Sequence, residues 1–162
     1  MQGTLLFFCG KMGAGKSTKA KELASDLGAV LLSEDEWLAK VYPEEIQTFA
    51  DYRKYSARLK PLLKQHVKDI LNKGISVVMD FPGNTRKQRA WFKEIFLQDN
   101  IPHKLIYLQV EDAVCLEHLQ QRRKNSPERS HFDTEEVFHQ VTSYFEAPSE
   151  EEDFKIEVIK KE

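Results

Sequence analysis

The sequence is poor in cysteine and contains no long hydrophobic run. Its two cysteines, Cys9 and Cys115, lie among apolar residues, so we expect buried small hydrophobic side chains; a redox or metal role is the less favoured alternative. No segment approaches the roughly 18 consecutive apolar residues that a membrane span needs. The five histidines show no ligand spacing, so no zinc site is predicted.

The chain also lacks a strong charge of either sign and a recognisable targeting signal. The formal net charge is -2, which does not call for nucleic acid or an anionic membrane as a partner, although a local basic patch stays open. The first four residues carry no positive charge, and the apolar run Leu5 to Cys9 is too short for a signal-peptide core. We therefore expect a cytoplasmic protein.

The length, the composition and the hydrophobic pattern of the chain are typical of one α/β domain. Its 162 residues are 41% hydrophobic and 31% charged, enough to bury a core, and a single domain over 1–162 is predicted. Apolar strand-like runs alternate with helical periodicity, which is typical of a parallel sheet. Strands are expected at 4–9, 29–32, 75–79, 104–108 and 154–159, the last at a sheet edge. Helices are expected at 16–27, 49–72, 85–98, 112–123 and 134–145, with Pro61 marking a kink or a new helix start.

A glycine-rich loop with the pattern G-x-x-x-x-G-K-[ST] lies between the first strand and the first helix. Glycines let the backbone bring its N–H groups against phosphate oxygens, and the helix N-terminus adds partial positive charge. A glycine-rich turn without a ligand is the alternative, but such a turn does not need Lys followed by Ser. We therefore predict that the loop binds ATP with Mg²⁺. The residues predicted to hold the nucleotide are Gly10, Lys11, Met12, Gly13, Ala14, Gly15, Lys16, Ser17 and Thr18.

Three polar side chains are predicted to act directly on the phosphates and the metal ion. Lys16 is expected to reach the β and γ phosphates, and Ser17 to supply an oxygen to magnesium. Asp80 ends an apolar strand that is expected beside the loop, so it is predicted to support the same ion, usually through water. An ordinary turn or helix cap is the alternative for Asp80.

Several branches of P-loop proteins are disfavoured. The chain has no Asn-Lys-x-Asp guanine-reading motif and no Leu-Ser-Gly-Gly-Gln stretch, and we expect it to be too short for a ring-forming ATPase with a helical lid domain. With its loop and order of elements, the chain resembles the small P-loop kinases, which include zeta-toxin-like kinases, chloramphenicol phosphotransferase, gluconate kinase and the 5′-kinase half of polynucleotide kinase. The resemblance covers nearly the full length, but only the loop is a sharp motif. It implies a three-layer P-loop NTPase fold with about five mostly parallel strands, helices on both faces and a small lid.

The resemblance assigns a role to Asp35, which follows the second strand. In such kinases an Asp at this place binds the acceptor hydroxyl and can act as general base, and phosphoryl transfer needs an acceptor held in line with somewhere for its proton to go. Glu34 and Glu36 compete for the role, and capping the following helix is the alternative for Asp35. The group often has an Arg shortly after this Asp; Leu38 and Ala39 stand there instead, which leaves the acceptor type open.

Two arginines after the third strand are candidates for the acceptor. The stretch from Asp80 to Arg89 resembles the segment in which these kinases often carry an Asp, then Asn-Thr and an Arg. Asn84 or Thr85 is expected to cap the next helix. Arg86 and Arg89 then share one helix face and are predicted to meet the acceptor or its phosphate; a solvated basic face is the alternative.

A further basic stretch resembles the lid of these kinases. Arg122 and Arg123 end a helix, and Arg129 follows after Pro127. A lid arginine stabilises charge on the transferring phosphoryl group, and a closing loop excludes water. Arg122 or Arg123 is the predicted catalytic arginine, whereas the helix dipole alone also favours basic residues there.

These observations predict an ATP-dependent phosphotransferase that acts on a hydroxyl of a small molecule. One variant is a polynucleotide 5′-hydroxyl kinase, which requires a basic channel. The other alternative is an ATP-binding regulatory or interaction module without an acceptor, which the missing Arg after Asp35 supports. The stretch between the second and third strands, where aromatic and basic residues interleave, is expected to be mostly core and otherwise to grip the acceptor.

Overall fold

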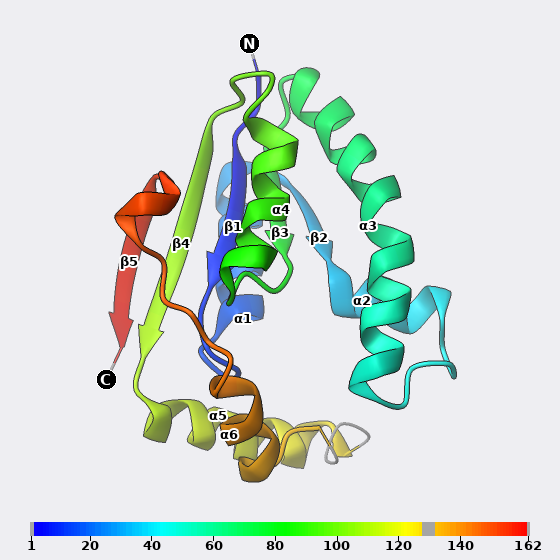
Figure 1. Cartoon of the computed structure of the whole chain (residues 1–162), viewed down its shortest axis with the longest axis vertical. Helices are drawn as coiled ribbons and strands as arrows, with labels where there is room; N and C mark the ends of the chain where they lie inside the picture. The colour runs from blue at the N-terminus through cyan, green and yellow to red at the C-terminus, as the bar shows by residue number, and fades with distance from the viewer. Residues whose placement is uncertain (1, 128–131, 162) are drawn as a thin grey trace.

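A five-stranded, wholly parallel sheet forms the centre of the computed structural model, which describes residues 2–127 and 132–161 (Figure 1). The strand order is β2-β3-β1-β4-β5. The strands are β1 Leu5–Cys9, β2 Val30–Ser33, β3 Val77–Asp80, β4 His103–Val110 and β5 Ile156–Lys161. Because every pair is parallel, all carboxyl ends meet at one edge of the sheet. The predicted fold class and the edge position of the last strand are confirmed.

Helices cover both faces of the sheet and make two separate apolar cores. Alternate residues of β1 point to opposite sides, so Phe7 packs in one core and Phe8 in the other. The helices α2 Glu34–Val41, α3 Phe49–Asn72 and α4 Arg86–Phe96 contribute to the first core. The helices α1 Lys16–Leu27, α5 Asp112–Asn125 and α6 Glu135–Thr142 contribute to the second. The result is the three-layer arrangement that the alternating pattern predicts.

Local signals in the sequence set the helix ends. The first helix starts after Gly15 and stops at Gly28, both with positive φ. Hydroxyl side chains accept a backbone N–H at the start of four others: Ser33 for α2, Thr48 for α3, Thr85 for α4 and Thr134 for α6. At α3 the cap is reciprocal, because Asp51 accepts the N–H of Thr48. The loops before these helices are thereby held in fixed directions.

Pro61 lies inside one continuous helix of 24 residues and does not begin a new one. A proline at this place removes the donor that would serve the carbonyl of Ala57 four residues earlier. Both Ala57 and Pro61 are exposed, on the side of α3 that faces away from the core. Solvent can therefore take over the lost hydrogen bond, which explains why the helix continues.

The C-terminal segment crosses back over the first face before it reaches β5. After α6 it runs past α4, makes one short turn at Glu150–Glu152 and then enters the sheet edge as β5 (Figure 1, orange to red). Among the described residues, no helix has the length and apolar character that crossing a membrane requires.

Candidate active site

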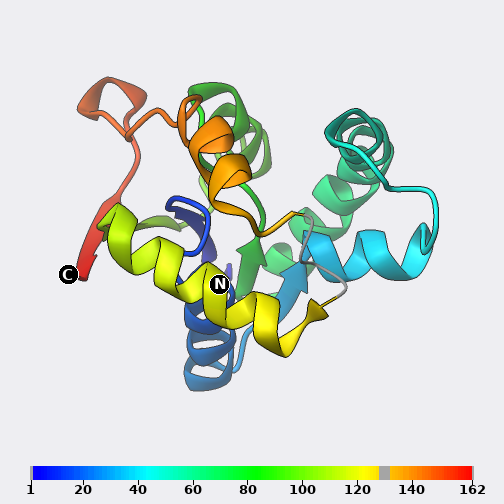
Figure 2. The same cartoon turned by 90° about the horizontal axis from the view of Figure 1, so that it is seen from below.

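The glycine-rich loop joins β1 to α1 at the carboxyl edge of the sheet, as predicted. Gly13 and Gly15 have φ of 80° and 97°, which favour glycine. A Cβ on Gly13 would lie 2.6 Å from the carbonyl oxygen of Cys115, so α5 packs directly against the loop. Seen from below, α5 passes beneath this edge of the sheet (Figure 2).

Lys16 is half-buried at the start of α1, where its Nζ donates to the carbonyl oxygen of Gly10 at 2.6 Å. Burial lowers the pKa of Lys16, and the negative charges of Asp80 and Asp35 oppose that effect. The ammonium is thus held at the loop by one carbonyl, and the charges of Asp80 at the end of β3 and of Asp35 in the first turn of α2 act on it. Phosphate oxygens would offer it stronger partners.

Ser17 and Asp80 meet beside Lys16. The hydroxyl of Ser17 donates to Oδ2 of Asp80 at 2.7 Å, because β1 and β3 are neighbours and end at the same level. Burial raises the pKa of Asp80, while the Ser17 hydrogen bond and the charge of Lys16 lower it. Since Thr85 caps the next helix, Asp80 is not its cap.

The oxygen pair of Ser17 and Asp80 suits a hard divalent cation. Within residues 2–127 and 132–161, no group of three or more His, Cys, Asp or Glu side chains could hold a metal by itself. An ion at this place would therefore complete its coordination with phosphate and water oxygens, as Mg²⁺ does at phosphate-transfer sites.

Asp35 is exposed in the first turn of α2, and its charge acts on both Lys16 and Asp80. The register explains the proximity, because Ser33 pairs with Asp80 across β2 and β3. The cap of α2 is Ser33, not Asp35. The structure therefore brings the loop, the end of β3 and Asp35 together.

The two competing carboxylates have other surroundings. Glu34 is 1% exposed, and it accepts hydrogen bonds from the hydroxyls of Tyr52 and of Ser56, the latter at 2.8 Å. Burial raises the pKa of Glu34, against the lowering effect of these two hydroxyls. Glu36 is exposed and pairs with Lys40 at 3.0 Å. Glu34 thus ties α2 to α3. Of the three neighbouring carboxylates, Asp35 is the one whose charge acts on Lys16.

Most aromatic residues between β2 and β3 belong to the core, as expected. Four of them pack against the first core, the one that contains Phe7: Trp37, Tyr42, Tyr52 and Tyr55. The rings of Tyr42 and Tyr55 lie 4.3 Å apart. Phe49 differs: it is 43% exposed and contacts Phe132, with ring centroids 6.3 Å apart. The start of α3 therefore meets the segment between α5 and α6.

Of the two candidate lid arginines, Arg122 is the one near the loop. Its positive charge lowers the pKa of Lys16, and it makes a bidentate pair with Asp133 at 2.8 and 2.7 Å. Asp133 is 1% exposed, so this pair fixes the end of α5 to the start of the α6 segment. Arg123 is exposed and lines a shallow pocket with Glu117 and Glu135. Arg129 lies outside the described residues.

A family model described as the AAA domain matches residues 5–148, which include the loop and all the site residues named so far. The chain belongs to this AAA-domain family.

Solved structures of kinases and of related proteins share the fold of this AAA-domain chain. A sugar kinase from Janibacter sp. is 18% identical, with 99% of this chain and 86% of that chain covered and a TM-score of 0.65. The Mycobacterium tuberculosis APS kinase CysC, in complex with AMPPNP and APS, is 17% identical (98% and 88% covered, TM-score 0.67). Chaetomium thermophilum Kti12, in complex with ADP-AlF3, is 16% identical (96% and 88% covered, TM-score 0.70). At these identities the likeness shows the fold, and it confirms the resemblance to small P-loop kinases.

The structure corrects the assignment of Arg89 to the acceptor. Its side chain is 0% exposed, and its guanidinium pairs with both carboxylate oxygens of Glu152 at 2.8 and 3.2 Å. It also donates to the carbonyl of Gly83 at 3.0 Å. No acceptor can reach this group, and Arg89 instead holds the C-terminal segment of the chain through Glu152.

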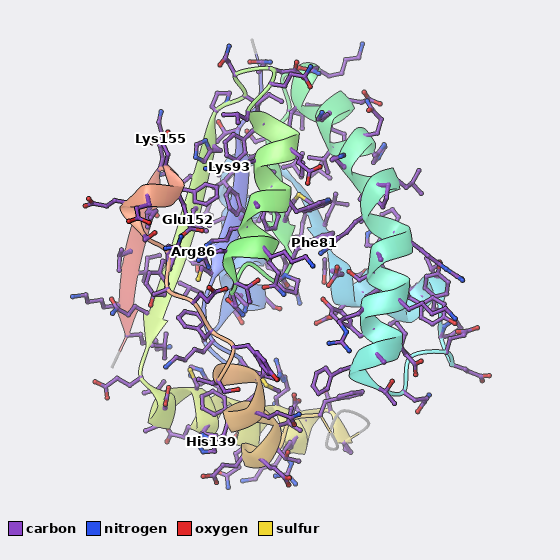
Figure 3. The ribbon with its side chains drawn as sticks, in the orientation of Figure 1. Phe81, Arg86, Lys93, His139, Glu152 and Lys155 are labelled. Carbon is purple, nitrogen blue, oxygen red and sulfur yellow. The ribbon has the colours of Figure 1, made fainter. Side chains whose placement is uncertain are left out.

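Arg86 lies on the same face of α4 but remains accessible. It donates to the hydroxyl of Ser149 at 3.1 Å and lies 3.8 Å from a carboxylate oxygen of Glu151. Figure 3 shows Arg86 and Lys93 on the side of α4 where Glu152 lies. With half of its side chain exposed, Arg86 keeps its acceptor role as a prediction.

Two contacts between α5 and the loop were missed at the sequence level. Nδ1 of His118 lies 2.7 Å from the carbonyl oxygen of Gly13, which makes Nδ1 the protonated nitrogen, and Lys11 pairs with Asp112 at 2.8 Å. His118 and Arg122 are four residues apart and therefore lie on one face of α5. That spacing could have indicated that the two residues act together, but it does not show which part of the molecule this face of α5 contacts.

Proposed function

We propose that this AAA-domain protein is an ATP-dependent phosphotransferase that moves the γ-phosphoryl group of Mg-ATP to a hydroxyl of a small molecule. The observation that supports it is the position of Asp35. An exposed carboxylate from a second strand end acts on the loop lysine together with Asp80. A carboxylate near the transferred phosphoryl group can take the proton of an acceptor hydroxyl, a task that phosphoryl transfer requires and nucleotide binding alone does not.

Each residue then has a role in the transfer. The acceptor oxygen forms a bond to the γ-phosphorus while the bond from that phosphorus to the β–γ bridging oxygen breaks, and ADP leaves. Asp35 takes the proton of the acceptor hydroxyl, and Lys16 and Arg122 face the negative charge of the phosphoryl group. Ser17 and Asp80 would hold Mg²⁺, which neutralises charge on the phosphates when bound.

The contact between Phe49 and Phe132 supports a site that closes. These rings come from the two sides of the site, the start of α3 and the segment after α5. Closure there would keep water from competing with the acceptor for the phosphoryl group.

Measurement of ADP release with a library of acceptors tests the proposal. Sugars, nucleosides, antibiotics and short 5′-hydroxyl oligonucleotides are each added to protein and Mg-ATP. At least one class is expected to raise turnover well above the rate with water alone. Tight ATP binding with no stimulating acceptor would reject phosphoryl transfer and favour the regulatory module.

A basic and aromatic cluster on α3 is the reason for including oligonucleotides in the library. Lys54 and Arg58 both lie 5.3 Å from the ring centroid of Tyr55 on α3, a basic and aromatic cluster in the region where the acceptor is expected. Stimulation by oligonucleotides, lost as salt is raised, would select the polynucleotide 5′-kinase variant.

Replacing Asp35 with asparagine is expected to abolish transfer while ATP binding is kept. The amide cannot take the acceptor proton, and we expect a loss of about a hundredfold or more in turnover. The measurement is acceptor-dependent ADP release beside calorimetric binding of Mg-ATP. Glu36→Gln is the matched control, because Glu36 is exposed one residue away and pairs with Lys40. Equal loss of binding and transfer in Asp35→Asn would contradict the role.

Replacing Arg122 with alanine is expected to slow transfer about tenfold to a hundredfold, because one cation facing the transferring group is lost. Arg123→Ala should have little effect, since Arg123 is exposed and lines the shallow pocket with Glu117 and Glu135. The measurement is turnover at saturating Mg-ATP for both variants. A larger loss for Arg123→Ala than for Arg122→Ala would reverse the assignment.

A further inference from the structure

The first residue of the glycine-rich loop is held by a side chain from another loop. The N–H of Gly10 donates to Oδ1 of Asn84 at 2.9 Å, across the 74 residues that separate them. Asn84 lies between β3 and α4, and β3 is the neighbour of β1, so the two strand ends bring the loops together. The contact therefore follows from the sheet order.

Asn84 can make this contact because its neighbours supply the helix cap. Thr85 accepts the N–H of Gln88 at 3.1 Å and so caps α4. Gln88 in turn accepts the N–H of Asn84 at 2.8 Å. The Asn84 side chain is thereby released from capping, and its backbone is held in place.

The C-terminal segment fixes Asn84 from a third direction. The N–H of Glu146 donates to the backbone carbonyl of Asn84 at 2.8 Å. Farther along, the buried pair of Arg89 and Glu152 fastens the segment to α4. The contact of Lys93 with the carbonyl of Glu152 does the same, and both of these residues are labelled in Figure 3. Asn84 is thus anchored by α4 and by the segment that follows α6.

Gly10 in turn contacts the loop lysine, Lys16. Its carbonyl accepts the hydrogen bond from Lys16, and its Cα sits where an added Cβ would lie 3.2 Å from the carbonyl of Leu108 and 3.3 Å from Ala14. Little room is left for this residue to turn, and the Asn84 bond determines the direction of its N–H. A continuous set of contacts therefore runs from Asn84 through Gly10 to Lys16.

We propose that Asn84 is a positioning residue for phosphate binding: its side-chain oxygen holds Gly10, and so the loop, in the conformation that receives the β and γ phosphates. The inference rests on the proposed binding of Mg-ATP. A loop that is already ordered loses less conformational freedom when the ligand binds. In this role Asn84 touches no phosphate and acts only through the loop. Loss of its side chain is therefore expected to raise the Kd of the nucleotide.

Calorimetric titration of Mg-ATP and Mg-ADP into Asn84→Ala tests the inference. The Kd of both nucleotides is expected to rise about tenfold, the order of one lost hydrogen bond. Thr85→Ala is the matched control, because it removes the cap of α4 at the residue adjacent to Asn84. It should lower the Tm and leave the Kd within about twofold of the wild-type value. Asn84→Ser is a second test, for use if the alanine variant folds poorly. The serine side chain is too short to reach Gly10, so the same rise in Kd is expected.

The outcomes separate the inference from the proposed function. Unchanged Kd values in both Asn84 variants, with normal binding by the wild-type protein, would overturn the inference alone. So would Kd values that rise in Thr85→Ala as much as in Asn84→Ala, because the effect would then be a general loss of structure. A wild-type protein that binds neither nucleotide rejects the proposed function, and the inference with it.

Discussion

Replacing Lys16 with alanine is expected to reduce ATP turnover by roughly a hundredfold or more, the scale seen when one charge-stabilising group is removed from a preorganised site. The ammonium lies at the Gly10 carbonyl, near the carboxylates of Asp35 and Asp80. Burial already lowers the pKa of Lys16, so the protein holds this cation at a place where water stabilises it poorly. Phosphate oxygens would replace the missing water, which makes Lys16 a strong contributor to affinity and turnover.

The measurement is ADP release at saturating Mg-ATP together with calorimetric binding. Lys19→Ala serves as the matched control, since Lys19 lies one turn along α1 and makes only a surface pair with Glu22 at 3.4 Å. The control should retain the wild-type turnover and Kd. If Lys16→Ala kept both quantities as well, the loop would not be a phosphate site and the whole functional proposal would fall.

The part of the site that local sequence could predict is the part built from consecutive residues. The loop, its flanking strand and helix, and the strand ending in Asp80 all follow from short-range patterns. The resemblance to small P-loop kinases added Asp35, and the pairing of β2 with β3 explains why this residue lies near the loop. Residue type also narrowed the cap of α4 to Asn84 or Thr85, and the structure shows that it is Thr85.

The other part depends on contacts between distant segments, and side-chain type does not predict those. Arg89 had the spacing of an exposed basic face, yet Glu152, 63 residues away, covers it. Asn84 had the chemistry of a cap, and its true partner is 74 residues earlier. For Arg89 the missing partner comes from the C-terminal segment, which crosses α4 before it enters the sheet. For Asn84 it comes from the pairing of β1 with β3, which brings the two loops together.

The same segment underlies a large expected effect on stability. Replacing Arg89 with leucine should lower the free energy of unfolding by about 3–5 kcal/mol, because it leaves the carboxylate of Glu152, 10% exposed, without its charged partner. Arg86→Leu is the matched control, since its contacts with Ser149 and Glu151 are exposed and should contribute about 1 kcal/mol or less. The measurement is urea unfolding at neutral pH.

A double variant and a pH series distinguish the ion pair from simple packing. Arg89→Leu with Glu152→Leu should be more stable than Arg89→Leu alone, because no unpaired charge remains. Burial raises the pKa of Glu152, but the hydrogen bonds and charge of Arg89 and the N–H of Ser149 outweigh it, so the net pKa is lowered from 4.5. The stabilisation by the Arg89–Glu152 pair is therefore present above about pH 4.5, and it is lost as the pH falls through the folded-state pKa of Glu152. The gap between wild type and Arg89→Leu should narrow over that range; a constant gap would mean that Arg89 acts through shape and not through charge.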